Sequence, residues 1–487
     1  MANQDNQASA PKYQLSVEKI GGTSMSAYEA VRDNIILYPE NLYQRAFVVS
    51  AYGGVTNLLL EHKKTGEPGV YGLFARGGDS HEWQKSLENL RAELLKINSE
   101  LFDDGEQLKH ANAFIDERIT DTREVLINLH EICSHGHFEL REHLLTVREL
   151  LASIGEAHSA YNLAALLKNH GVNSQFVDLS GWNNAAKMPL DEHILTAFAN
   201  IDFNTTLPIV TGYAHCTENL ISTFDRGYSE MTFSRIAVML QACEAVIHKE
   251  FHLSSADPRL VGEENAVPIG KTSYDIADQL ANIGMEAIHP RAGKGLRQSH
   301  IPLRIKNTFE PDHHGTLITA DYKAEMPRVE IIAGMERLIA VEIFDQDMVN
   351  LQSDYEMHIL KITKRLQCQV VGKDFNANTI TLYIDGSLKK VSRATAQMEE
   401  AFPSARITTS QLCMVSAMGS NMRVKGLLAT AIKSLADQDI NIEAMHQNTR
   451  QVEMQIFVDN AHFATAVKAL HQSLIEVHNH GNSIAKH

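Results

Sequence analysis

A lysine followed by two glycines is the first feature of this sequence that could do chemistry. Lys19 lies at the end of the apolar segment LSVEKI, and Gly21 and Gly22 follow it in KIGGTS. An ammonium group beside bare backbone N–H groups can bind phosphates. The order differs from the Walker A pattern GxxxxGK[ST]. Alone, the motif fits a tight turn after a surface strand equally well.

A second glycine turn strengthens the first. Ser50, Gly53 and Gly54 belong to SAYGGVTN, which follows the apolar, β-branched segment AFVVSA. Ligands of α/β proteins bind at the carboxyl ends of parallel strands, and both turns would lie at that edge. The pair therefore predicts a phosphate-binding site more strongly than either turn alone.

The elements around these turns predict an α/β fold with a parallel sheet. Strands are expected at 15–20 and 46–51, with helices following each glycine turn at 26–37 and 58–64. Two repeats of strand, glycine turn and helix are typical of such a fold. Charged segments of helical period between residues 80 and 170 predict a helical insertion.

The C-terminal part repeats a small α+β unit. Two successive segments follow the order β-α-β-β-α, at a period of roughly 70 residues. An internal repeat of this kind indicates a second functional layer rather than a continued catalytic domain.

Composition excludes several classes of function. A net charge of −16 disfavours nucleic-acid binding. No apolar stretch reaches the roughly 18 residues that span a bilayer, and the polar N-terminus lacks a signal-peptide core, so no membrane association and a cytoplasmic protein are expected. The five cysteines are dispersed. The histidines between 130 and 143 lack a metal-binding motif, so no metal site made of protein side chains alone is expected.

The ordered motifs resemble those of aspartate kinases in the amino-acid kinase superfamily. KIGGTS and VVSAYGGVTN are followed, in the family's order, by SIGEAHSA (153–160), PIVTGY (208–213), DRGYSEMTF (225–233), ADPR (256–259), IHPRA (288–292) and IPLRIKNTFEPDHHGTLI (301–318). The resemblance implies an amino-acid kinase fold, a parallel-rich sheet sandwiched by helices, with two C-terminal ACT-like α+β modules. ACT modules are where the family keeps its regulation.

The resemblance also implies domain boundaries. The expected parts are a disordered arm at 1–12, a kinase domain at 13–320 with a helical insertion at about 76–150, a linker with the first regulatory strand at 321–335, ACT modules at 336–410 and 411–480, and a tail at 481–487. In the family one module is inserted into the other, so 329–334 would belong with the second module.

The resemblance assigns roles to individual residues. Lys19 would contact the transferring phosphoryl group, and Glu230, where the family usually has aspartate, would orient that lysine. The expected nucleotide-phosphate residues are Lys19, Gly21, Gly22, Ser50, Gly53 and Gly54. The expected aspartate-binding residues are Thr56, Glu156, Arg226 and Ser229. Independently, a carboxylate suits the substrate ammonium, and an arginine can hold a carboxylate through two hydrogen bonds.

Part of the nucleotide site departs from the family. Lys249 stands where the family has the first aspartate of T-D-V-D-G, and Glu286 replaces the lysine before the HP motif. An exchange of charge between these two positions is one explanation, in which the two side chains face each other or the same nucleotide. The resemblance implies that Arg259, in the motif ADPR, binds the nucleotide. These departures, together with residues 58–74, resemble aspartate kinases dedicated to the compatible solute ectoine.

Effector binding is expected at the turn after the first strand of each module, where free N–H groups meet a carboxylate. Asp345 and Asp347 in the first turn would repel such a carboxylate. The second candidate site comprises Met418, Gly419, Asn421 and Gln447. We expect weak or altered feedback inhibition; a role of the modules mainly as a dimer interface is the alternative.

The expected reaction is phosphorylation of L-aspartate by ATP to give 4-phospho-L-aspartate, with Mg²⁺ bound mainly through the nucleotide phosphates and with a homo-oligomer formed through the ACT modules. The carboxylate nucleophile is already ionised at pH 7, so no general base is needed. Three alternatives stay open: a kinase of another amino-acid carboxylate, an aspartate kinase of lysine, threonine or methionine synthesis, and a non-catalytic ACT sensor.

Overall fold

The computed structural model describes residues 14–63, 65–77, 80–103, 105–182, 187–224, 227–285, 287–447 and 449–477. The expected arm at 1–12 and the tail at 481–487 lie outside these ranges. The chain forms two compact units. The first comprises residues up to His252 together with Ile288–Ala320, and the second comprises Leu253–Ala287 together with the residues from Asp321 onward. Residues 253–287, expected in the kinase domain, thus group with the regulatory part.

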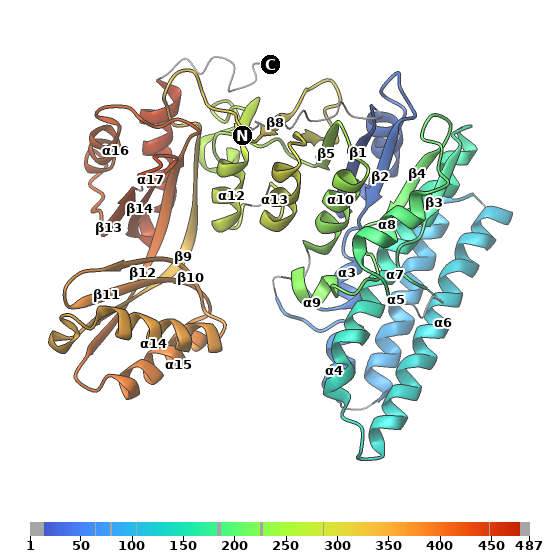
Figure 1. Ribbon diagram of the computed structural model, residues 1–487, viewed down its shortest axis with the longest axis horizontal. Helices are drawn as coiled ribbons and strands as arrows, with labels where there is room; N and C mark the ends of the chain where they lie inside the picture. Colours follow the sequence, from blue (N-terminus) through green and yellow to red (C-terminus); the bar gives the residue numbers. More distant parts are fainter. Residues whose placement is uncertain are drawn as a thin grey trace, which may run out of the picture. The chain divides into compact units, whose positions relative to one another are not determined.

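A parallel sheet forms the centre of the first unit (Figure 1). Its strands follow the spatial order β3-β4-β2-β1-β5-β7-β8, and β8 is antiparallel to β7. Every residue of β2 and β4 is buried, as expected for strands covered on both faces. The strands are β1 (Ser16–Ile20), β2 (Arg45–Val49), β3 (Ser174–Val177), β4 (Leu207–Thr211), β5 (Glu244–Lys249), β7 (Leu303–Asn307) and β8 (Thr316–Thr319).

Three long helices carry the expected insertion. They are α5 (Ser80–Leu101), α6 (Glu106–Ser134) and α7 (Leu140–Asn169). Helix α7 is partly exposed at its start and almost wholly buried from Leu151 to Leu167, where small and apolar residues predominate. One helix therefore joins the insertion to the core of the sheet domain.

Shorter helices complete the first unit. They are α1 (Gly22–Met25), α2 (Tyr28–Ala30), the π-helical η1 (Val31–Ile36), α3 (Val55–Leu59), α4 (Val70–Ala75), α8 (Leu190–Phe198), α9 (Leu220–Phe224), α10 (Tyr228–Met239) and α13 (Pro290–Gln298). In the part of the chain that is described, no helix combines the length and apolarity needed to cross a bilayer.

The helix expected at 58–64 is wrong. Helix α3 ends at Leu59, and Glu61 then forms an antiparallel bridge with Pro68. Gly66 has a φ of +71°, which reverses the chain, and Gly69 lies so close to Leu58 that a Cβ would come within 2.3 Å of the Leu58 carbonyl oxygen. Glycine conformation and close backbone approach thus override the helical propensity of the leucines.

An antiparallel sheet forms the centre of the second unit, in the order β10-β11-β9-β12-β14-β13 (Figure 1). Its strands are β9 (Ile331–Phe344), β10 (Gln369–Phe375), β11 (Thr379–Asp385), β12 (Arg406–Met418), β13 (Ala444–Gln447) and β14 (Glu453–Asp459). The remaining elements are α11 (Pro258–Val261), β6 (Lys271–Ser273), α12 (Tyr274–Asn282), η3 (Gln346–Met348), α14 (Gln352–Arg365), α15 (Leu388–Ala401), α16 (Leu427–Ala436), η4 (Asn460–His462), α17 (Phe463–His471) and η5 (Gln472–Glu476).

The two central strands, β9 and β12, run through both halves of this sheet. They pair from Ile331 opposite Met418 to Phe344 opposite Arg406. The C-terminal half of β9 packs with α14 and α15. Ile332, in the N-terminal half of β9, packs with α16 and α17. The expected module boundaries at 335/336 and 410/411 therefore fall inside continuous strands, and the two modules share one sheet.

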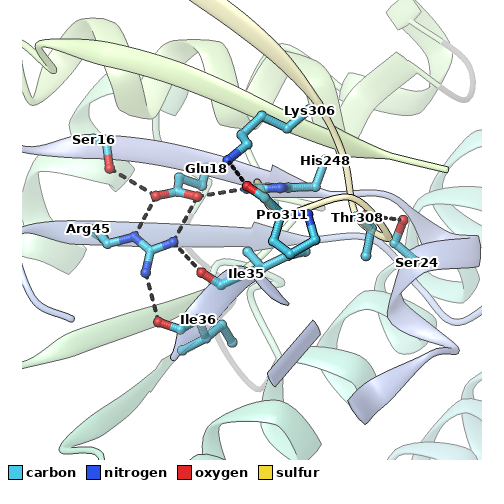
Figure 2. A network of polar contacts seen from close by, with 10 residues as sticks. All are labelled: Ser16, Glu18, Ser24, Ile35, Ile36, Arg45, His248, Lys306, Thr308 and Pro311. Atoms are coloured by element: carbon cyan, nitrogen blue, oxygen red, sulfur yellow. Dashed lines mark hydrogen bonds and ion pairs between the residues drawn. The ribbon is translucent and has the colours of Figure 1, made fainter. Parts of the chain in front are cut away.

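A buried carboxylate ties three strands of the first unit together (Figure 2). Glu18 on β1 accepts two hydrogen bonds from Arg45 on β2, at 2.6 and 3.1 Å, and one from His248 on β5 at 2.7 Å. Arg45 also donates to the carbonyl oxygens of Ile35 and Ile36 at the end of η1. Burial favours the neutral acid, but Arg45 and His248 lower the pKa of Glu18. Burial lowers the pKa of His248, so the ring is neutral at pH 7 and donates through Nε2.

Removing one partner of this buried pair should destabilise the first unit. Arg45→Met leaves an uncompensated carboxylate, which costs about 3–5 kcal/mol. We expect a lower midpoint in thermal and urea unfolding. The double variant Glu18→Leu, Arg45→Met should recover much of the loss, because no unpaired charge remains buried. Arg32→Met, which breaks an exposed pair with Asp33, is the control and should change little. Equal effects of the two arginine variants would contradict this account.

Candidate active site

Lys19 and Glu230 form the centre of the site. Lys19 is on β1, between β2 and β5, and its Nζ lies 3.5 Å from Oε1 of Glu230 in the first turn of α10. The backbone N–H of His289 donates to the other oxygen of Glu230. Burial favours the neutral acid, but the ammonium groups of Lys19 and Lys249 lower the pKa of Glu230. Glu230 is therefore a fixed anion that orients a lysine.

The two glycine turns lie against each other beside Lys19. A Cβ on Gly22 would come within 2.6 Å of the carbonyl oxygen of Ala51, so only glycine fits there. The backbone N–H of Gly53 donates to Ser26 Oγ at 2.9 Å. Gly54 has a φ of +85°, which favours glycine and starts α3. The turns thus present exposed backbone at the carboxyl ends of β1 and β2, where phosphates can bind.

Two further details complete these turns. Gly21 has a φ of −70° and precedes α1 in extended conformation, so the first turn is not left-handed. The backbone N–H of Gly21 donates to the carbonyl oxygen of His248 at 3.3 Å. The N–H of Ser50 donates to the carbonyl oxygen of Ile20 at 3.1 Å. Both turns are thereby fixed by backbone hydrogen bonds to neighbouring strands.

Glu156 and Ser229 form a second polar pair next to the lysine. Ser229 Oγ donates to Oε1 of Glu156 at 2.6 Å. The other oxygen, Oε2, is buried and has no hydrogen-bond partner among the described residues. Burial raises the pKa of Glu156 to about 8, although Ser229 and Lys19 act in the opposite direction. An enclosed oxygen of this kind can accept a hydrogen bond from a ligand ammonium group.

The other expected substrate residues are placed less completely. Thr56 lies on α3, and this helix packs against α7 near Glu156, where Gly155 leaves no room for a Cβ beside Ala51 and Val55. Arg226 lies outside the described residues.

Of the residues expected on the nucleotide side, Lys249 is described at the end of β5 and Glu286, its expected partner, lies outside the described residues. The ammonium group of Lys249 contributes to lowering the pKa of Glu230. Arg259 belongs to the second unit, on α11, where its guanidinium is 89% exposed and bonds to Asp257.

Sequence reasoning missed Gly212. This residue follows β4, and a Cβ there would lie 2.8 Å from Glu156 Oε2 and 2.8 Å from the Val49 carbonyl oxygen. The absence of a side chain therefore allows the backbone after β4 to pack against Oε2 and Val49. The signal was a glycine directly after an apolar strand in PIVTGY.

Comparisons with known proteins agree with this geometry. The sequence model of the amino acid kinase family matches residues 14–307, and that of the ACT domain matches residues 415–474. Aspartate kinase Ask_Ect of Stutzerimonas stutzeri (strain A1501) is 54% identical over 473 residues, covering 96% of this chain and 99% of that protein. An aspartokinase of Candida albicans (strain SC5314 / ATCC MYA-2876) is 24% identical, covering 98% of this chain and 93% of that protein.

Solved structures show the same fold. Aspartokinase III of E. coli in complex with lysine and aspartate superposes with a TM-score of 0.72 at 18% identity, covering 95% of this chain and 100% of that one. Aspartate kinase of Clostridium acetobutylicum gives 0.70 at 20% identity, covering 94% and 100%. The chain therefore belongs to the amino acid kinase family, and within that family to the aspartate kinases.

Adding one methyl group at Gly212 should damage the amino-acid side of the site. In Gly212→Ala, either Glu156 or the end of β2 must move, and misplacement by about 1 Å can lower the rate roughly 100-fold. We expect kcat/KM for the amino-acid substrate to fall by this order with an unchanged circular dichroism spectrum. Gly295→Ala on α13, whose Cβ would meet nothing closer than 4.0 Å, is the matched control. Normal kinetics of Gly212→Ala would refute the assigned role.

Proposed function

We propose that this protein transfers the γ-phosphoryl group of ATP to the side-chain carboxylate of L-aspartate, giving ADP and 4-phospho-L-aspartate. The observation that carries the proposal is the joint placement of three features: the Lys19–Glu230 pair, the two glycine turns, and Glu156 with an enclosed free oxygen. The Lys19–Glu230 pair and the glycine turns suit a nucleoside triphosphate, and Glu156 suits the α-ammonium group of an amino acid. Aspartokinase III of E. coli, which shares this fold, has been solved in complex with aspartate and ADP.

Each group has a definable task in this reaction. Lys19 neutralises charge on the transferred phosphoryl group, and those N–H groups of the glycine turns that are not bonded within the chain hold the nucleotide phosphates. Arg226 would bind the α-carboxylate of aspartate, with Thr56 and Ser229 lining the same pocket. The acceptor carboxylate is ionised at pH 7, so proton removal is not part of the step.

Mg²⁺ would enter with the nucleotide. Within the described ranges no three His, Cys, Asp or Glu side chains gather as a protein-held metal site would require. We propose that the ion is bound mainly through phosphate oxygens and water, as Mg²⁺ often is. Its chemistry is neutralisation of phosphate charge.

A hydroxamate assay tests the proposal directly. The purified protein is incubated with ATP, Mg²⁺ and hydroxylamine, and with either aspartate or glutamate as acceptor. Aspartyl hydroxamate with aspartate alone supports the proposal. Preference for glutamate would identify a kinase of another amino-acid carboxylate. If no product forms with either acceptor, the protein is better explained as a non-catalytic ACT sensor. Lys19→Met serves as the inactive control.

The pathway we propose is ectoine synthesis. Residues 58–74 and the rewritten segment 248–252 support this, and so does the name Ask_Ect of the Stutzerimonas stutzeri relative. Genes for ectoine-synthesis enzymes beside the gene for this protein would agree. A neighbourhood of lysine, threonine or methionine enzymes would favour general amino-acid synthesis instead.

Both proposed effector turns already hold a carboxylate of the chain itself. In the first turn, Asp345 is buried and accepts hydrogen bonds from Asp347 N (3.0 Å), Tyr355 Oη (2.9 Å) and Ser404 Oγ (2.8 Å). Asp345 therefore already accepts a hydrogen bond from its own turn, at Asp347 N. This adds to the repulsion that Asp345 would exert on a ligand carboxylate. In the second turn, buried Glu330 accepts a hydrogen bond from Ser420 Oγ at 2.6 Å.

Two further donors of the second turn are also engaged. The N–H of Gly419 donates to Val452 O at 3.0 Å, and the amide of Asn421 donates to Ala324 O at 3.0 Å. Met418 is fully buried, and its carbonyl oxygen accepts from the N–H of Glu330. Gln447 ends β13 and is exposed. These contacts support weak or altered feedback inhibition.

Lysine or threonine added alone at sub-millimolar concentration should therefore leave the reaction rate nearly unchanged. The reason is that a free amino acid would have to displace carboxylates that the chain holds in place. Initial rates at sub-saturating aspartate are the measurement. Strong inhibition by either amino acid would show that the turns open readily and would refute the prediction.

We also propose that the protein acts in the cytoplasm as a homo-oligomer, assembled through the ACT modules. Exposed apolar side chains support self-association: Met357 on α14, Phe375 on β10 and Leu388 on α15 are 52%, 60% and 61% exposed. Light scattering after size-exclusion chromatography measures the mass. A monomer at micromolar concentration would argue against this assembly.

Aspartate binding should depend on pH through Glu156. Because the pKa of Glu156 is raised to about 8, the side chain is mostly neutral at pH 7 in the free enzyme. Binding an ammonium group favours the carboxylate, so a proton is released on binding. We expect kcat/KM for aspartate to rise between pH 6.5 and 8.5. Glu156→Gln should be slower and should lose this rise; an unchanged pH profile in this variant would contradict the assignment.

A further inference from the structure

The second glycine turn is held against helix α7 by two contacts at its start. Ser159 Oγ donates a hydrogen bond to the carbonyl oxygen of Ser50 at 2.9 Å. The ring of Tyr52, which is only 5% exposed, packs edge-on against the ring of His158, with centroids 5.4 Å apart and planes at 73°. The two glycines of the turn directly follow Tyr52 in the chain, so the placement of this side chain affects their backbone.

His158 takes part in a buried hydrogen-bond network with α5 and α6. Its Nε2 lies 2.6 Å from Oδ1 of Asn98, and Nδ2 of Asn162, one turn further along α7, donates to the same oxygen at 2.8 Å. Burial lowers the pKa of His158 to about 3, so the ring is neutral at pH 7 and has one N–H. Because Nδ2 of Asn98 donates to Oδ1 of Asn112 at 2.9 Å, Oδ1 is the atom that faces His158. An amide oxygen can only accept, so Nε2 of His158 carries the proton.

The network ends at the glycine turn. Burial raises the pKa of Tyr52, and a hydrogen bond from the side chain of Asn162 opposes that rise. Tyr52 thus interacts with both residues of α7 that Asn98 holds. Asn98 and Asn112 belong to α5 and α6, so all three long helices of the insertion are linked to this turn (Figure 1).

Two donors that converge on one acceptor restrict the position of α7. His158 and Asn162 are four residues apart and therefore lie on the same face of the helix. A rotation or a slide of α7 relative to α5 would break both hydrogen bonds to Asn98. Buried hydrogen bonds add little net stability over apolar side chains of the same shape, but they permit only one arrangement. The network therefore suits the fixing of a position better than the stabilisation of the insertion.

We propose that Asn98 and His158 are positioning residues that hold Tyr52 and thereby set the phosphate-binding backbone of the second glycine turn. The helical insertion then determines the geometry of the nucleotide site. Both residues act through Tyr52 rather than on a substrate. This inference rests on the proposed kinase function, in which the turn binds the phosphates of ATP.

His158→Leu tests the proposal, because leucine fills a buried position but supplies neither the N–H nor the ring. The hydroxamate assay gives the KM values for ATP and aspartate, and calorimetry gives the affinity for Mg–ADP. We expect the KM for ATP to rise and the affinity for Mg–ADP to fall, each about tenfold. The KM for aspartate should stay within about threefold. His158→Gln, whose amide can donate to Asn98, should lie closer to the wild type, and it keeps the test open if His158→Leu folds poorly.

Arg91→Met is the matched control. Arg91 on α5 also links two helices of the insertion, because its Nε donates to Asp116 on α6 at 2.7 Å. This variant should leave the KM for ATP and the affinity for Mg–ADP unchanged, even if its thermal unfolding midpoint falls. Equal effects of Arg91→Met and His158→Leu on Mg–ADP affinity would overturn the proposal, since both would then report only the stability of the insertion.

A double variant separates positioning from a structural role. In a Tyr52→Leu background, His158→Leu should change the KM for ATP by roughly twofold at most, because the side chain through which it acts is gone. Independent, multiplicative effects would overturn the proposal, and so would a Mg–ADP affinity that His158→Leu leaves unchanged. A wild-type protein that binds Mg–ADP but forms no aspartyl hydroxamate would refute the kinase function alone.

Discussion

The buried Glu18 carboxylate is the interaction on which the site depends. Through Arg45 and His248 it joins β2, β1 and β5, and through Arg45 it also fixes the end of η1. A buried charge with incomplete hydrogen bonding is costly, so this arrangement tolerates little displacement of the three strands. Because strand side chains alternate, fixing Glu18 and His248 on one face also fixes the lysines that follow them on the other. The hydrogen bonds of Glu18 on one face of the sheet therefore also position the lysines on the opposite face.

Two glycines allow the close backbone contacts on which the site depends. Gly22 allows the first turn to contact Ala51 of the second, and Gly212 allows the backbone after β4 to pack closely against Glu156. In both places a Cβ would meet backbone atoms that cannot move without moving a strand. The site is therefore shaped as much by missing side chains as by charged ones, and the sheet edge brings phosphate groups and the acceptor together.

Much of this arrangement could be predicted from local patterns. Apolar strands ending in Lys19 and in the second glycine turn indicated the fold class and the sheet edge. What failed depended on distant contacts. The helix expected at 58–64 is ended by Gly66 and by the close approach of Gly69, and the module boundaries disappear because β9 and β12 pair along their whole length. The relation of Lys249 to Glu230 follows from strand register, which a single sequence does not reveal.

In the regulatory sheet, both proposed effector turns are held by carboxylates of the chain itself. Turn donors that are not satisfied by a ligand must be satisfied by water or by the chain. Here Asp345 and Glu330 supply carboxylates from within the same sheet unit. A tethered group has a high effective concentration, so a free amino acid competes poorly with it. Burial raises the pKa of Glu330, while hydrogen bonds from Ser420 oppose that rise. The fold of both turns is therefore stabilised by contacts within the chain.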